Sequence, residues 1–187
     1  MSGKLIAYLR RRGRDVSRFG GAREGATAVE FAMVAPALIA TLIAIIEVMY
    51  FLFAQQTLQT AAVEMGRLFM TNQGPSQGST VNGNGQLLNT SNICNIIQPV
   101  LTCGSVTVDV QAYSDYGSAN TSTLQLYNGG TPITNFNYTA GTPGQIVVIR
   151  LAYQLTTITG PLGFVLSSLS NGKMEVMGVT AIRVEPT

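Results

Sequence analysis

The sequence predicts an α+β protein, in which a long N-terminal helix precedes a small, loop-rich domain with a three- or four-stranded antiparallel sheet. Three observations predict this fold. Residues 31–46 form an apolar run without a charge, residues 54–70 continue it with helical periodicity, and the C-terminal half contains segments of alternating apolar residues. A helix packed on an antiparallel sheet is a common layered arrangement.

The N-terminal leader, residues 1–25, is strongly basic. It holds seven of the eleven Lys and Arg residues and has a net charge of +5, whereas the remainder has a net charge of −3. Basic residues are retained on the cytoplasmic side of a membrane, so the leader is predicted to be cytoplasmic and the rest to face outward. The acidic remainder argues against a nucleic-acid surface. Gly20 and Gly21 are expected to leave the backbone extended and accessible before residue 25.

Residues 26–70 are predicted to form one helix, with a transmembrane part at 31–53 and an amphipathic part at 54–70. A membrane-spanning helix needs about 20 mainly apolar residues. Pro36 has no N–H to donate, which predicts a kink. A cleaved secretory signal is the competing interpretation, but its apolar core would be shorter and would end at a small-x-small site, which is missing near residue 53.

The amphipathic part carries an apolar stripe that is predicted to pack against the domain. Its members are Leu58, Ala61, Ala62, Met65, Leu68 and Phe69. Glu64 and Arg67 form an i,i+3 pair on the opposite side of the helix.

Residues 71–187 are predicted to form a periplasmic globular domain. Its strands are expected at residues 105–113, 145–157 and 173–184, with a short edge strand at 124–127. Loops or turns are expected at 71–86, 128–144 and 161–170, and a short helix or irregular segment at 87–99. Along the first strand valines alternate with polar residues, which predicts one buried face and solvated carboxylates at Asp109 and Asp115.

Cys94 and Cys103 both follow the apolar run, and this topology places them in an oxidising compartment. A disulfide is therefore predicted, the alternative being two free thiols. The chain has no histidine, so histidine-based catalysis and the usual zinc ligands are absent. No cofactor, metal or enzymatic activity is expected.

Glu30 lies at the cytoplasmic border of the apolar run, where a carboxylate is costly unless it reaches headgroups or finds a cationic partner. Cleavage after Gly25 would create such a partner, because the new α-amino group of Ala26 is positively charged near neutral pH. Glu30 would then be the fifth residue of the mature chain.

This stretch resembles a known family. The basic leader, Gly25, Glu30, Phe31 and the apolar helix resemble the class III leader of type IV pilins. With Pro36 and Glu47 included, the segment is similar to TadE-like pseudopilins, which are minor pilins of the tight adherence (type IVb, Flp) pilus system. The motif covers about 30 of the 187 residues.

The resemblance implies a single-pass inner-membrane protein that prepilin peptidase processes at Gly25–Ala26. It also implies contacts with other pilin and minor pilin subunits and with inner-membrane pilus platform proteins. Glu30, Phe31 and Glu47 would serve assembly, and the question of incorporation into the extracellular pilus stays open.

Glu47 has two interpretations. It lies 16 residues after Phe31, about 24 Å along a helix, in the outer part of a bilayer about 30 Å thick. An intramembrane carboxylate is a functional candidate by default, here for contact with another pilin or a platform protein. The alternative is a side chain that snorkels outward.

Two classes of function follow. The first is a structural, non-enzymatic pilus subunit, and the second is an N-terminally anchored periplasmic binding or adhesin domain unrelated to pili. The leader separates them, because an ordinary anchor has no use for Gly25 and Glu30.

Overall fold

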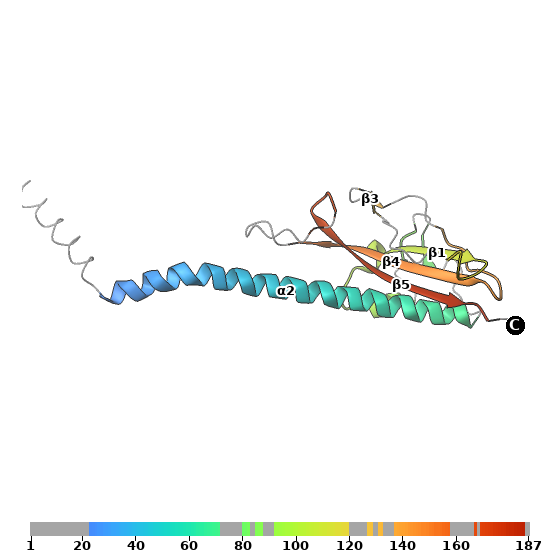
Figure 1. Cartoon of the computed structure of the whole chain (residues 1–187), viewed down its shortest axis with the longest axis horizontal. Coiled ribbons are helices and arrows are strands. Elements are labelled where there is room, and N and C mark those ends of the chain that lie inside the picture. The colour runs from blue at the N-terminus through green and yellow to red at the C-terminus, as the bar shows by residue number, and fades with distance from the viewer. Residues whose placement is uncertain are drawn as a thin grey trace, which may run out of the picture. The chain divides into compact units, whose positions relative to one another are not determined.

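The structure is a computed structural model that describes residues 23–71, 80–82, 85–87, 92–119, 127–128, 131–132, 137–157, 167 and 169–185. Helix α2 (Arg23–Met70) is followed by α4 (Cys94–Ile97) and by a 3-10 turn (Cys103–Ser105). The strands are β1 (Thr107–Tyr113), β2 (Tyr127–Asn128), β3 (Thr131–Pro132), β4 (Ile146–Thr156) and β5 (Lys173–Arg183) (Figure 1). The predicted leader up to residue 22, most of the predicted loop at 71–86 and most of the predicted turn at 161–170 lie outside the described residues.

Helix α2 runs without interruption for 48 residues and begins at Arg23. The helix therefore begins three residues before the predicted start at residue 26 and includes the Gly25–Ala26 bond. Gly20 and Gly21, where an extended backbone was expected, lie outside the described residues. Strong helix formers follow Gly25, and one exposed glycine costs only about 1 kcal/mol in a helix, which is too little to end it. The helix also continues through Pro36; the kink there stays a prediction.

Strands β1, β4 and β5 form one antiparallel sheet in the order β1-β4-β5. The α+β prediction is confirmed, and the three long strands lie within about two residues of their predicted limits. Strands β2 and β3 form a separate two-stranded sheet. The predicted edge strand at 124–127 thus overlaps β2 only at Tyr127, and its other residues lie outside the described part of the chain.

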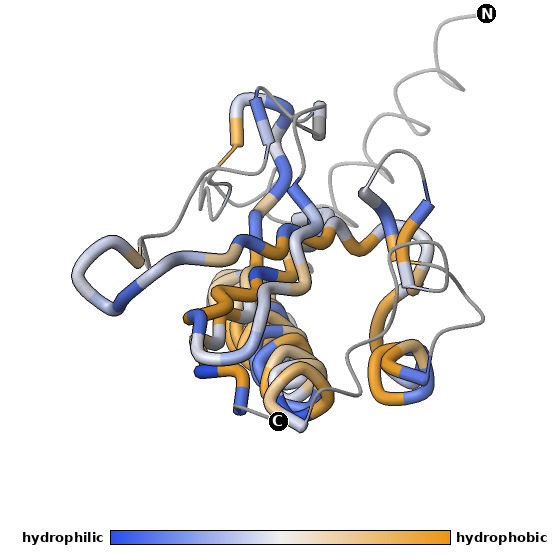
Figure 2. Tube along the Cα trace, turned by 90° about the vertical axis from the view of Figure 1, so that its right-hand side faces the viewer, coloured by the Kyte–Doolittle hydropathy of each residue, from blue (hydrophilic) through white to orange (hydrophobic). Residues whose placement is uncertain are grey.

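The main core lies between the sheet and residues 54–69 of α2. The predicted stripe on α2 is buried, except that Leu68 is only partly so, and it packs on the valines and leucines of one sheet face. Figure 2, in which α2 is seen nearly end-on, shows apolar residues on the helix and on the strands beside it. The apolar face of each element therefore meets the other and is removed from water, which is the main stabilising force of the domain.

Two glutamines of α2 join the helix to the outer edge of β5. The Gln55 side-chain amide donates to the Met177 carbonyl at 2.6 Å and accepts from the Met177 N–H at 3.3 Å. The Gln59 amide makes the same pair of bonds with Val179, at 2.9 and 3.1 Å. Four helical residues rise about 6 Å and two strand residues about 6.6 Å, so the two amides match alternate strand positions.

The opposite edge of the sheet, on β1, is also hydrogen-bonded to the chain itself. Val108 N–H donates to the Gly85 carbonyl at 2.8 Å, and Val110 N–H donates to the Asn137 carbonyl at 2.8 Å. Exposed strand edges invite pairing with other chains. At these positions the edge N–H and carbonyl groups of β1 and β5 already form hydrogen bonds within the domain. This disfavours assembly in which another chain adds a strand to the sheet.

The second face of the sheet is buried as well, against the prediction of a half-buried first strand. Thr107 and Asp109 are buried beside the valines of β1. Asp109 accepts a hydrogen bond from the buried Arg150 guanidinium at 2.7 Å, and the two residues are directly opposed between β1 and β4. The prediction that Asp109 is solvated was therefore wrong. Side chains such as Tyr127 cover this face, a tertiary arrangement that the valine pattern does not encode.

Candidate assembly site

The predicted processing and assembly residues lie on the first turns of α2. Ala26, Glu30 and Phe31 are exposed. Ala26 and Glu30 are four residues apart, so they share one face of the helix, one turn apart. A Cβ added to Gly25 would meet nothing within 4 Å. Packing against the described residues therefore gives no reason for glycine at this position.

After these residues, α2 exposes apolar side chains around its whole circumference. The exposed set is Val29, Phe31, Met33, Val34, Leu38, Ile39, Leu42, Ile43, Ile45, Ile46, Val48, Met49, Tyr50, Leu52 and Phe53. Helices that are apolar all round are found in membranes or in the cores of large assemblies. Within the described part of the chain, α2 is the one helix long and apolar enough to cross a membrane.

Glu47 lies where α2 meets the ends of β4 and β5. Its side chain is half-buried, and one of its carboxylate oxygens is buried. With Val48, Phe51, Leu155 and Met174 it lines a small hollow of about 40 Å³. The structure thus gives Glu47 an environment within its own domain, and its role in assembly stays a prediction.

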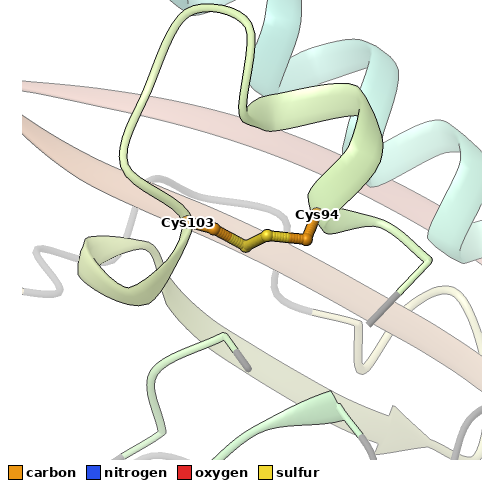
Figure 3. The surroundings of a disulfide bond; sticks show 2 residues. All are labelled: Cys94 and Cys103. Atoms are coloured by element: carbon orange, nitrogen blue, oxygen red, sulfur yellow. A yellow bond between two sulfur atoms is a disulfide. The ribbon is translucent and has the colours of Figure 1, made fainter. Parts of the chain in front are cut away.

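Cys94 and Cys103 form a disulfide, as predicted (Figure 3). Both cysteines are buried, and their Cα atoms are 5.6 Å apart. The bridge joins the start of α4 to the start of the 3-10 turn. The loop that it closes contacts α2, because the Tyr50 hydroxyl donates to the Val100 carbonyl at 3.5 Å. The bridge therefore limits the motion of a loop that lies against the helix.

Outside the apolar segment, hydrogen bonding or burial shifts the pKa values of Glu64, Asp115 and Tyr127. Glu64 and Arg67 form the predicted pair at 2.6 Å, and hydrogen bonding to Arg67 lowers the pKa of Glu64. Asp115 is exposed as predicted, and the Ser118 N–H lowers its pKa. Burial raises the pKa of Tyr127 to about 12. Among the described residues no cluster of three His, Cys, Asp or Glu side chains could hold a metal ion.

Sequence reasoning missed the Asp109–Arg150 pair and the two glutamines. A signal for the first was available, because Arg150 interrupts an otherwise apolar strand and a buried guanidinium requires a partner. Nothing local identified Gln55 and Gln59, because polar residues on a helix are ordinarily solvated.

Residues 25–67 match the family described as TadE-like protein. This segment is TadE-like. The match begins at Gly25, includes Glu30 and Glu47, and ends within α2; it confirms the resemblance stated above. It covers less than a quarter of the chain. No curated protein and no solved structure matched the chain.

Proposed function

We propose that the chain is a minor pilin, or pseudopilin, that takes part in assembly of a tight adherence pilus. The observation that carries this proposal is that the TadE-like match, which begins at Gly25 and includes Glu30, coincides with an exposed apolar helix. Its role is structural and not enzymatic, and it acts through pilus components in the inner membrane. The domain is periplasmic and the leader cytoplasmic.

The proposal assigns a recognition role to Gly25. Space and backbone conformation do not demand a glycine there, because an added Cβ would meet nothing within 4 Å. In this proposal prepilin peptidase recognises Gly25 and cleaves the bond between Gly25 and Ala26. Cleavage removes the basic leader and leaves the new ammonium one helical turn from Glu30, so a single event creates the ion-pair partner of the carboxylate.

Replacing Gly25 with leucine should leave the leader attached in cells with active prepilin peptidase, while Gly25→Ala should still be processed because its side chain is small. The measurement is the N-terminal sequence of the membrane-bound protein. A wild-type chain that still begins at Met1 in such cells would remove the pilin proposal and favour an ordinary anchored periplasmic domain.

Replacing Glu30 with glutamine should leave insertion and cleavage intact but abolish most co-purification of other pilus subunits. The apolar run and the Gly25–Ala26 bond are unchanged, and burying an amide costs less than burying a charge. The Ala26 ammonium, however, would enter a low-dielectric helix assembly without its partner.

Glu64→Gln is the matched control for this experiment, because it removes an exposed carboxylate from the same helix beyond the apolar run. It should leave co-purification and pilus number per cell at wild-type levels. A Glu30→Gln protein that is cleaved, inserted and fully active in both assays would show that Glu30 is only a border residue.

A further inference from the structure

The end of the sheet beside Tyr50, where β4 ends and β5 begins, contains an open polar cleft. We call it the Tyr50 cleft. The described residues that line it include Tyr50, Tyr153, Gln154, Thr156 and Lys173, and its volume is about 320 Å³. A second hollow, of about 460 Å³, shares Tyr50 and Tyr153 with it. Binding sites for small ligands commonly have volumes of about 300–1,000 Å³.

The lining of the Tyr50 cleft suits an anionic, oxygen-rich group. Among the described residues that line it, Lys173 is the only one that carries a charge at neutral pH, and no carboxylate lines either hollow. The remaining polar groups are mainly tyrosine, serine and threonine hydroxyls and glutamine amides, all of which can donate to phosphate oxygens. Lysine is a common phosphate binder.

The position of Tyr50 on α2 indicates where such a group would come from. Large apolar residues are exposed from Val29 to Phe53. Counted from Phe31, beside the border carboxylate Glu30, a hydrocarbon core of about 30 Å corresponds to about 20 helical residues and ends near Tyr50. Headgroups begin at that depth, and tyrosine is enriched there.

A small hollow beside the cleft has mostly apolar walls. Val48, Phe51, Met174 and the half-buried Glu47 line it, and it shares Tyr50, Leu155 and Thr156 with the Tyr50 cleft. A polar pocket for a headgroup therefore adjoins an apolar surface that can contact the start of an acyl chain.

We propose that the Tyr50 cleft binds the phosphate headgroup of a phospholipid in the outer leaflet of the membrane that α2 spans, with Lys173 as its cationic contact. This inference rests on the membrane anchoring in the proposed function. A bound lipid would hold the membrane-proximal end of the sheet at the bilayer surface before the subunit leaves the membrane.

The test uses the full-length protein in phosphatidylglycerol vesicles that contain a phosphatidylglycerol with a photoreactive diazirine on its headgroup. Cross-linked peptides are mapped by mass spectrometry. Cross-links should concentrate at Tyr50, residues 153–156 and Lys173, and Lys173→Gln should lower them about tenfold through loss of a charge-assisted contact. Lys173→Arg should retain them.

Arg183→Gln is the matched control. Arg183 is exposed at the opposite end of β5, about 33 Å away along the strand, and this variant should cross-link like the wild type. Equal cross-linking of Lys173→Gln and wild type, or cross-links spread evenly over the domain, would overturn the headgroup site.

Two further labelling experiments distinguish a lipid from a free phosphate, and failure of the headgroup site from failure of the membrane anchoring. Glycerol phosphate with the same diazirine, added to detergent-solubilised protein, should label the cleft weakly; labelling as strong as in vesicles would overturn a lipid origin. A phospholipid with the diazirine on its acyl chain should label residues 29–46. Failure of that labelling would overturn the membrane anchoring and the headgroup site together, whereas failure of cleft labelling alone would leave the proposed function standing.

Discussion

Replacing Gly178 with alanine should destabilise the domain by about 3 kcal/mol or more. An added Cβ would overlap the backbone carbonyl of Leu58 and lie 2.8 Å from the backbone nitrogen of Gln59. Backbone atoms within a helix cannot rotate away as a side chain can. The helix would have to withdraw from β5, and both glutamine amides would then lose their strand partners.

Gly66→Ala provides the matched control, because Gly66 also lies where α2 faces β5. Its added Cβ would meet the methyl group of Thr180 at 3.0 Å, a side-chain atom that can move. Alanine also favours a helix by about 1 kcal/mol over glycine, so the net cost should stay under about 1 kcal/mol. The measurement is guanidinium unfolding of the full-length protein in detergent. Equal stability of Gly178→Ala and wild type would show that α2 does not lie against β5 in this way.

Replacing Arg150 with methionine should cost about 3–5 kcal/mol, because it leaves the buried Asp109 carboxylate without its opposite charge. Asp109 also accepts hydrogen bonds from Asn137 N–H and from the Gln111 side chain, each at 3.2 Å. These contacts do not replace a guanidinium at 2.7 Å. Arg183→Met, on an exposed part of β5, should change stability by less than about 0.5 kcal/mol.

The double variant Asp109→Asn with Arg150→Met should recover part of that loss. It removes both charges and keeps an acceptor oxygen at position 109 for the Asn137 N–H. The double variant should therefore be more stable than the sum of its single variants predicts, by about 1–3 kcal/mol. Strict additivity in the same unfolding assay would show that the two charges do not interact across β1 and β4.

The candidate assembly site could be read from the sequence because it is local. Gly25, Glu30 and the apolar run are close together in one helix, where spacing along the chain fixes spacing in space. Periodicity likewise located α2, β1, β4 and β5. The described helix begins three residues before the predicted residue 26, because Gly25 costs a helix only about 1 kcal/mol.

Periodicity in the sequence predicted the long apolar helix, the amphipathic stripe beyond it and the three long strands, and the structure confirms these elements. The assembly role of Glu30, Phe31 and Glu47 stays a prediction. Three features are visible only in the tertiary structure. Asp109 and Arg150 are buried together, Gln55 and Gln59 form hydrogen bonds with the edge of β5, and the backbone of α2 approaches Gly178 too closely for a larger residue. The physical reason is that periodicity records which face of an element avoids water. Whether the second face is buried depends on which other segments lie against it. The same holds for the contacts of Asp109 with Arg150, which are 41 positions apart, and of the two glutamines with β5, about 120 positions away.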